Sequence, residues 1–136
     1  MVLTKFIARA ASEFDTLLKA SLESSAKSGT RVFALFTGDS NEDGKSWCPD
    51  CNDCKPLVSA TFAQAGGAGD VHLIEVPLVR AEYKGNPDHW ARKHPGVGLK
   101  AIPTLILWGK TKKVAELVEG ECADSIRVKE LVLEDQ

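Results

Sequence analysis

The stretch Trp47-Cys48-Pro49-Asp50-Cys51 decides how this sequence is interpreted. It places two thiols three positions apart, beside a tryptophan. A polar loop at residues 39–46 separates them from an apolar, β-branched and aromatic run at residues 31–37, which is typical of a buried strand. Cysteines at this spacing can bring their sulfurs together in a small disulfide ring. The pattern therefore predicts a protein that exchanges electrons between thiol and disulfide.

Within this motif, Cys48 is predicted to be the nucleophile and Cys51 the resolving thiol. A helix beginning at Cys48 would direct unpaired backbone N–H groups and the positive end of its dipole toward that sulfur, which stabilises a thiolate. Pro49 suits the first turn, because its missing N–H would have had no partner there. Cys51 would lie one turn further in, placed to attack a mixed disulfide on Cys48. Asp50 favours the helix but opposes a second negative charge nearby.

A second candidate site element is Ala101-Ile102-Pro103-Thr104, just before a predicted strand. An X–Pro bond at such a turn is a candidate cis peptide. A cis bond would place backbone groups of Ile102 where an extended substrate could pair with them, whereas the alternative is an ordinary trans proline. Trp47 is expected to form an apolar floor for substrates. His89 and Trp90 could shape a specificity rim, with ordinary packing as the alternative.

Hydrophobic periodicity predicts one α/β domain over residues 1–136. Strands are expected at 2–8, 31–37, 71–76, 104–108 and 113–118, and helices at 11–25, 48–65, about 87–93 and 125–133. Ser12 is the expected N-cap of the first helix, Pro56 should bend the second, and the glycine-rich residues 66–69 should end it. Early helical crossovers imply parallel strands and the final hairpin adds antiparallel ones. The prediction is one mixed sheet with helices on both faces.

Composition excludes several other classes of protein. The chain has 136 residues, a net charge of −2, 43% hydrophobic and 26% charged residues, so it offers no basic surface for nucleic acid or an anionic membrane. No apolar run approaches the ~20 residues of a membrane span, and the N-terminus lacks a signal-peptide pattern. Four cysteines in such a chain favour catalytic or metal-bound thiols in the cytoplasm over a disulfide framework.

Several motifs spread along nearly the whole chain match one known family. Trp-Cys-x-x-Cys follows a strand, Pro56 lies five residues beyond Cys51, and Pro103 precedes a hairpin. Further matching segments are LFTG at 35–38, GKS at 44–46, IPTL at 102–105 and EGEC at 119–122. In these features the chain resembles thioredoxin and, more narrowly, the cytosolic thioredoxin-related Clot family.

The resemblance implies a thioredoxin-like fold, with a central mixed sheet flanked by helices on both faces. It implies a monomeric disulfide reductase with no bound cofactor, recharged by an NADPH-dependent thioredoxin reductase. Its substrates would be small disulfides such as cystine and selected protein disulfides, and the family is also credited with peroxidase activity.

Carried over by position, Cys48 and Cys51 become the redox pair and Pro103 the substrate-facing proline. Thioredoxins place a buried acid in the strand before the motif, whereas this sequence has Leu35 at the nearest equivalent position. The usual acceptor of the Cys51 proton is then missing, and Asp50 or water is the hypothetical substitute.

Other interpretations of the same residues remain. Cys48, Cys51 and Cys54 also begin an iron–sulfur pattern, which Cys122 could complete for iron or zinc, although its spacing is not local. The acidic loop at 39–50 has the oxygen spacing of an EF-hand, but a strand enters it where a helix is needed. We therefore assign no metal and leave the roles of Cys54 and Cys122 open. A non-enzymatic redox sensor or adaptor with the same fold is the alternative function.

Overall fold

In the computed structural model, which describes residues 2–64 and 69–133, five strands form a single mixed sheet. The strands are β1 (Leu3–Ile7), β2 (Arg31–Gly38), β3 (Val71–Leu78), β4 (Thr104–Trp108) and β5 (Lys113–Val118). Their spatial order is β1-β3-β2-β4-β5. β1 and β2 pair with β3 in parallel, and β4 pairs antiparallel with both β2 and β5. The predicted mixed sheet is confirmed.

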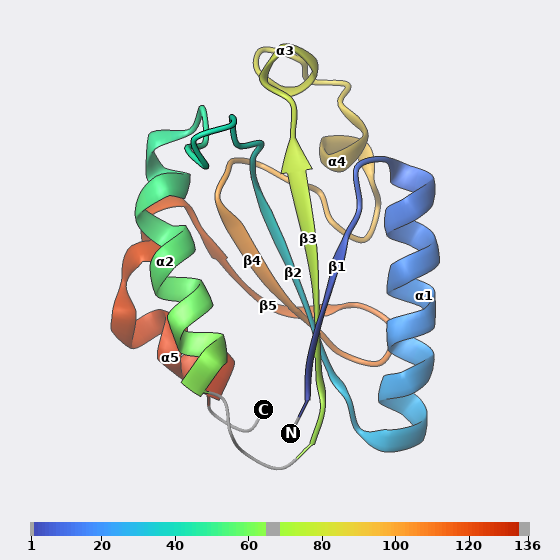
Figure 1. Ribbon diagram of the computed structural model, residues 1–136. Helices are drawn as coiled ribbons and strands as arrows, with labels where there is room; N and C mark the ends of the chain where they lie inside the picture. The colour runs from blue at the N-terminus through green and yellow to red at the C-terminus, as the bar shows by residue number, and fades with distance from the viewer. Residues whose placement is uncertain (1, 65–68, 134–136) are drawn as a thin grey trace.

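Helices cover both faces of this sheet, as predicted (Figure 1). They are α1 (Ala11–Ser28), α2 (Pro49–Gln64), α3 (Arg80–Tyr83), α4 (Trp90–Lys93), α5 (Ser125–Leu133) and the 3₁₀ helix η1 (Glu119–Ala123). α1 and α4 lie on one side of the sheet, and α2 and α5 on the other (Figure 1). None of the helices in the described ranges is both long and apolar enough to cross a membrane.

The ends of α1 differ from the prediction. Ser12 is not the N-cap: the cap is Ala10, in extended conformation and without a side-chain hydrogen bond. The backbone N–H of Arg9 is instead satisfied by the Glu13 carboxylate at 2.8 Å. The helix ends at Gly29, where a φ of 74° and an N–H bond to the Ser25 carbonyl close the last turn.

α2 begins at Pro49, one residue later than predicted, and continues through Pro56 to Gln64. Its predicted end falls mainly in residues 65–68, which lie outside the described residues. Residues 80–100, where one helix at about 87–93 was expected, contain the two four-residue helices α3 and α4. η1 was not predicted at all.

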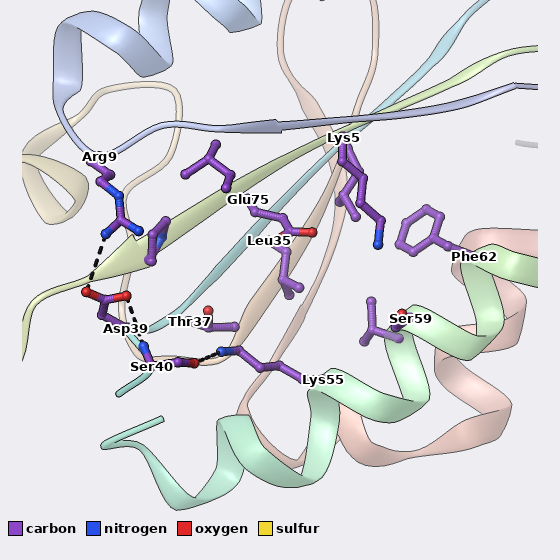
Figure 2. Close-up of a pocket in the computed structure, with 14 residues that line it drawn as sticks. Lys5, Arg9, Leu35, Thr37, Asp39, Ser40, Lys55, Ser59, Phe62 and Glu75 are labelled. Carbon is purple, nitrogen blue, oxygen red and sulfur yellow. Dashed lines mark hydrogen bonds and ion pairs between the residues drawn. The ribbon is translucent and has the colours of Figure 1, made fainter. Parts of the chain in front are cut away.

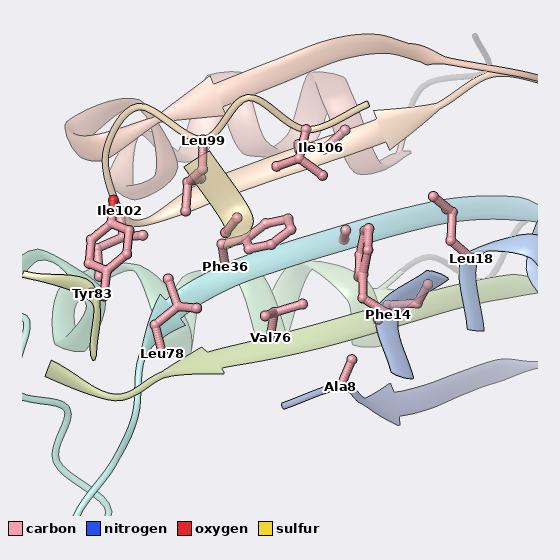
Figure 3. Close-up of a cluster of buried hydrophobic side chains, with 14 of the residues drawn as sticks. Ala8, Phe14, Leu18, Phe36, Val76, Leu78, Tyr83, Leu99, Ile102 and Ile106 are labelled. Atoms are coloured by element: carbon pink, nitrogen blue, oxygen red, sulfur yellow. The ribbon is translucent and has the colours of Figure 1, made fainter. Parts of the chain in front are cut away.

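The hydrophobic core forms a separate cluster on each face of the sheet. β2 supplies both clusters, because its side chains alternate between the faces: Val32, Ala34 and Phe36 join one, and Phe33 and Leu35 the other. Figure 3 shows the first cluster, running from α1 along β2 and β3. The same cluster also includes both cysteines of the motif, so the predicted redox pair lies at the margin of the core.

Candidate redox site

The motif is fastened to the end of β2 by Ser46. The Ser46 hydroxyl donates to the carbonyl oxygen of Gly38 at 2.8 Å and accepts the backbone N–H of Cys48 at 3.1 Å. Asn52, in α2, also holds this loop, because its side chain accepts the Ser46 N–H and donates to the Ser46 carbonyl. These bonds fix where α2 begins and therefore where the two cysteines lie.

The structure brings the predicted pair together, with the two sulfurs 2.7 Å apart. Cys48 immediately precedes α2, and its carbonyl accepts the N–H groups of Cys51 at 3.0 Å and Asn52 at 3.3 Å. Cys48 is 7% exposed, whereas Cys51 is fully buried one turn inside the helix. Of the two residues, only Cys48 therefore keeps any exposed surface.

Cys51 is held in its protonated form by its surroundings. Burial raises the pKa of the Cys51 thiol well above its ordinary value, and its hydrogen bond to Cys48 raises that pKa further. The backbone N–H of Gly38, 3.4 Å from the Cys51 sulfur, opposes this shift without cancelling it. A buried thiol of this kind attacks only when its proton is taken away, which suits a resolving role.

The Ile102–Pro103 peptide bond is cis, as predicted, and lies against the dithiol. The carbonyl oxygen of Ile102 is 4.0 Å from the Cys48 sulfur. Residues of η1 hold this turn in place: the Pro103 carbonyl accepts the N–H of Glu119 at 2.7 Å and contacts the Cys122 sulfur at 3.6 Å. The Ile102–Pro103 segment, which was predicted to face the substrate, is therefore anchored to η1.

Trp47 and Asp50 differ in how firmly they are held. The indole N–H of Trp47 donates to the carbonyl of Leu78, at the end of β3, at 2.8 Å, and the ring is partly buried. Asp50 lies exposed in the first turn of α2. The tryptophan ring is thus a fixed surface beside Cys48, and the aspartate is open to solvent.

Leu35, which occupies the place of the expected buried acid, pairs with Glu75 in β3. Both residues line a cavity of about 360 Å³ between α2 and strands β1 to β3 (Figure 2). Lys5 and Lys55 lie at its sides, and Lys55 donates to the Ser40 hydroxyl at 2.7 Å. Its described lining residues do not include either cysteine of the motif.

Cys54 and Cys122 are buried thiols, and the acidic loop is held by hydrogen bonds within the loop itself. Burial raises the pKa of Cys54, inside α2, to about 11 and that of Cys122, in η1, to about 12. In the loop, the side-chain oxygen of Asn41 accepts the backbone N–H groups of Asp43 and Lys45, both at 3.0 Å. Across residues 2–64 and 69–133, no group of three or more His, Cys, Asp or Glu side chains is arranged to hold a metal ion.

Sequence reasoning missed Tyr83, which the structure places in one buried cluster with the dithiol, and Arg92, which stacks on the Tyr83 ring. Tyr83 belongs to the same buried cluster as both cysteines of the motif, and the Arg92 guanidinium lies 4.0 Å from the centre of its ring. Both come from residues 80–100, and no spacing pattern in the sequence marks them as site residues. The suggested rim residue Trp90 instead packs on Phe14, with 5.7 Å between ring centres.

Comparisons with known proteins identify the family. Residues 8–134 match the model of the thioredoxin domain-containing protein 17-like thioredoxin domain. The chain is 36% identical over 107 residues to thioredoxin domain-containing protein 17 of Homo sapiens, covering 79% of this chain and 81% of the relative. It is 31% identical over 90 residues to the thioredoxin-like protein Clot of Oryza sativa subsp. japonica, covering 64% and 65%.

Another relative is longer than this chain. An acireductone dioxygenase of Leishmania braziliensis is 36% identical over 121 residues, which is 86% of this chain, and the match spans only 35% of that protein. Among solved structures, a thioredoxin of Nicotiana alata superposes with a TM-score of 0.62 at 16% identity, covering 99% of this chain and 96% of its own. That similarity shows the thioredoxin fold.

Proposed function

This chain belongs to the thioredoxin domain-containing protein 17-like family, and from that premise we propose that it is a disulfide reductase acting through Cys48 and Cys51. The observation that carries the proposal is the pair of sulfurs 2.7 Å apart at the start of α2, the first in a residue that is 7% exposed and the second in a fully buried residue. The cis Ile102–Pro103 segment beside Cys48 supports it, because an extended substrate needs backbone partners there.

The proposed cycle moves two electrons from the protein to the substrate. The Cys48 thiolate attacks one sulfur of a substrate disulfide, a mixed disulfide forms, and the other substrate sulfur leaves as a thiolate. Cys51 then gives up its proton through water or the exposed Asp50 and attacks the Cys48 sulfur. The second substrate thiol departs, and Cys48–Cys51 remains as a disulfide. A flavin-containing reductase using NADPH, or glutathione, restores the dithiol.

The proposed substrates, electron donor, oligomeric state and location follow the family resemblance. The substrates are small disulfides such as cystine and selected protein disulfides, with peroxidase activity in addition. Thioredoxin reductase is the proposed electron donor, and no bound cofactor, nucleic acid or membrane takes part. We place this chemistry in a monomer in the cytoplasm.

Replacing Cys51 by serine tests the assignment of the two thiols. Without the resolving thiol, C51S should react with cystine once and retain a cysteine joined to Cys48, because nothing releases the mixed disulfide. Intact-protein and peptide mass spectrometry under non-reducing conditions would detect this adduct. C54S is the matched control, and it should turn over cystine and accumulate no adduct. Turnover by C51S at the unsubstituted rate, with no adduct on Cys48, contradicts the proposal.

A further inference from the structure

Tyr83, the last residue of α3, packs beside the redox pair. It is 4% exposed and shares a buried cluster with Cys48 and Cys51. Its ring centre lies 6.4 Å from that of Trp47, the neighbour of Cys48 in the chain. Figure 3 shows Tyr83 and Ile102 at the same end of this cluster, and the Ile102 carbonyl is the group 4.0 Å from the Cys48 sulfur.

The hydroxyl of Tyr83 is buried but has no hydrogen-bond partner among the described residues, and the same holds for Nε of Arg92. The two groups are stacked, with the Arg92 guanidinium 4.0 Å from the tyrosine ring centre. Nη1 of Arg92 donates to the Lys100 carbonyl at 3.1 Å, which ties this stack to the segment leading into the cis peptide. An unpaired buried hydroxyl is destabilising, so its presence calls for an explanation such as a role in the reaction.

The electrostatics of Tyr83 connect it to both sulfurs. Burial raises the pKa of Tyr83, the Arg92 cation opposes that shift, and negative charge on Cys48 or Cys51 raises the pKa further. The tyrosine oxygen is therefore within electrostatic reach of the dithiol. At neutral pH it remains an O–H group and can act only as a neutral donor or acceptor.

Ionisation of Cys48 changes the hydrogen-bond partners that stabilise its sulfur. As a thiol, Cys48 can donate to the Ile102 carbonyl, but a thiolate has no proton to donate and is repelled by that oxygen. The Cys51 S–H already faces the Cys48 sulfur at 2.7 Å. A donor on the Ile102 side would stabilise the thiolate, and Tyr83 lies at that end of the cluster with its O–H unpaired.

We propose that the Tyr83 hydroxyl donates a hydrogen bond to the Cys48 sulfur when that sulfur is an anion, and that Arg92 is the positioning residue for the tyrosine ring. This inference rests on the proposed function. The hydroxyl is not consumed: it supports the thiolate before the attack on a disulfide, loses that bond when Cys48 enters the mixed disulfide, and regains it when a reductant regenerates the dithiol.

The test is Y83F, followed by alkylation of Cys48 with iodoacetamide across a range of pH. Without the donor, the pH midpoint of alkylation should rise by about one unit and the rate below that midpoint should fall about tenfold. The charged and titratable groups that face Tyr83 are unchanged in this variant: Arg92, His89, Cys48, Cys51 and Glu119. Thermal unfolding should stay the same or move to higher temperature, because an unpaired buried hydroxyl is removed and the ring is kept.

In Y83F, slower alkylation of Cys48 together with undiminished stability would show that the Tyr83 hydroxyl acts on the sulfur and not on the stability of the fold. W108F is the matched control, since it also removes a buried donor without a described partner, at the far end of β4. It should leave the alkylation midpoint of Cys48 unchanged. Alkylation of Y83F at the unsubstituted rate at every pH, with or without a loss of stability, overturns the proposal. The alkylation readout needs no substrate, so absence of cystine turnover in the unsubstituted protein would refute the proposed function separately.

Discussion

Cys48 and Cys51 are the same chemical group in two different environments. Cys48 stands before the first turn of α2 with part of its surface open, and Cys51 is enclosed one turn later. Burial is the largest cause of the raised pKa of Cys51. The sequence spacing already indicated this division of roles, because a helix starting at the motif places Cys48 at its open N-terminus and Cys51 one turn further in.

Cys54 and Cys122 should make the fold sensitive to alkali. Their pKa values of about 11 and about 12 lie above the ordinary 9.0, so between these values the folded state keeps protons that the unfolded chain has lost. The stability that these two thiols contribute is complete below pH 9 and disappears as pH rises through 11 and 12. The slope is about 1.4 kcal/mol per pH unit for each thiol.

Urea denaturation at a series of pH values measures this slope. The double variant C54A/C122A should lose stability less steeply above pH 9 than the unsubstituted protein, while both show similar slopes near neutral pH. The comparison between the two proteins removes the contribution of Cys51 and of other groups that titrate in alkali. Identical slopes above pH 9 would show that the burial of these two thiols does not govern their titration.

The junction between β2 and α2 positions the site. β2 ends at Gly38, and a Cβ built there would lie 2.7 Å from the Ser46 hydroxyl, 2.8 Å from the Trp47 ring and 3.0 Å from the Cys48 Cβ. The strand end and the motif therefore fit together only because residue 38 has no side chain. The sequence showed a glycine at the end of a strand, but the close approach of the motif is visible only in three dimensions.

G38A should displace the motif from the end of β2. Because Ser46, Trp47 and Cys48 would all have to shift, we expect at least a roughly tenfold loss in the rate of cystine reduction, and a destabilisation of about 1–3 kcal/mol from overpacking. Steady-state kinetics and chemical denaturation measure the two effects. G120A is the control, since a Cβ there would meet no atom within 4 Å beyond the neighbouring residues of its own helix. Unchanged kinetics in G38A would mean that the contacts around residue 38 do not control the dithiol.

Element boundaries were predictable where the local signal was strong. The bounds of β4, β5 and α5 match those expected, because apolar runs, a glycine-containing hairpin turn and a regular helical period mark them. α3 and η1 were missed, because each spans only four or five residues, which is too short to show a helical period of apolar residues. Packing holds them in place, through Tyr83 in α3 and Cys122 in η1, both of them buried.

The whole molecule assembles its site from segments far apart in the chain. The antiparallel pairing of β4 with β2 brings Ile102 to Cys48 across 54 positions of sequence. The dithiol, the cis proline and the mixed sheet could be predicted because each has a short motif or an element order of its own. The Tyr83–Arg92 stack could not, because it exists only once the connection between β3 and β4 has folded against the end of the sheet.

The central claim, that this fold carries a catalytic dithiol, is tested most directly by following NADPH oxidation in the presence of thioredoxin reductase and excess cystine. The account predicts many turnovers per molecule of protein and none above the reductase background for C48S. A redox sensor or adaptor would instead be oxidised once by cystine and would not be recharged by the reductase, so NADPH oxidation would stay at the reductase background. That absence of turnover, or full turnover by C48S, would contradict the account.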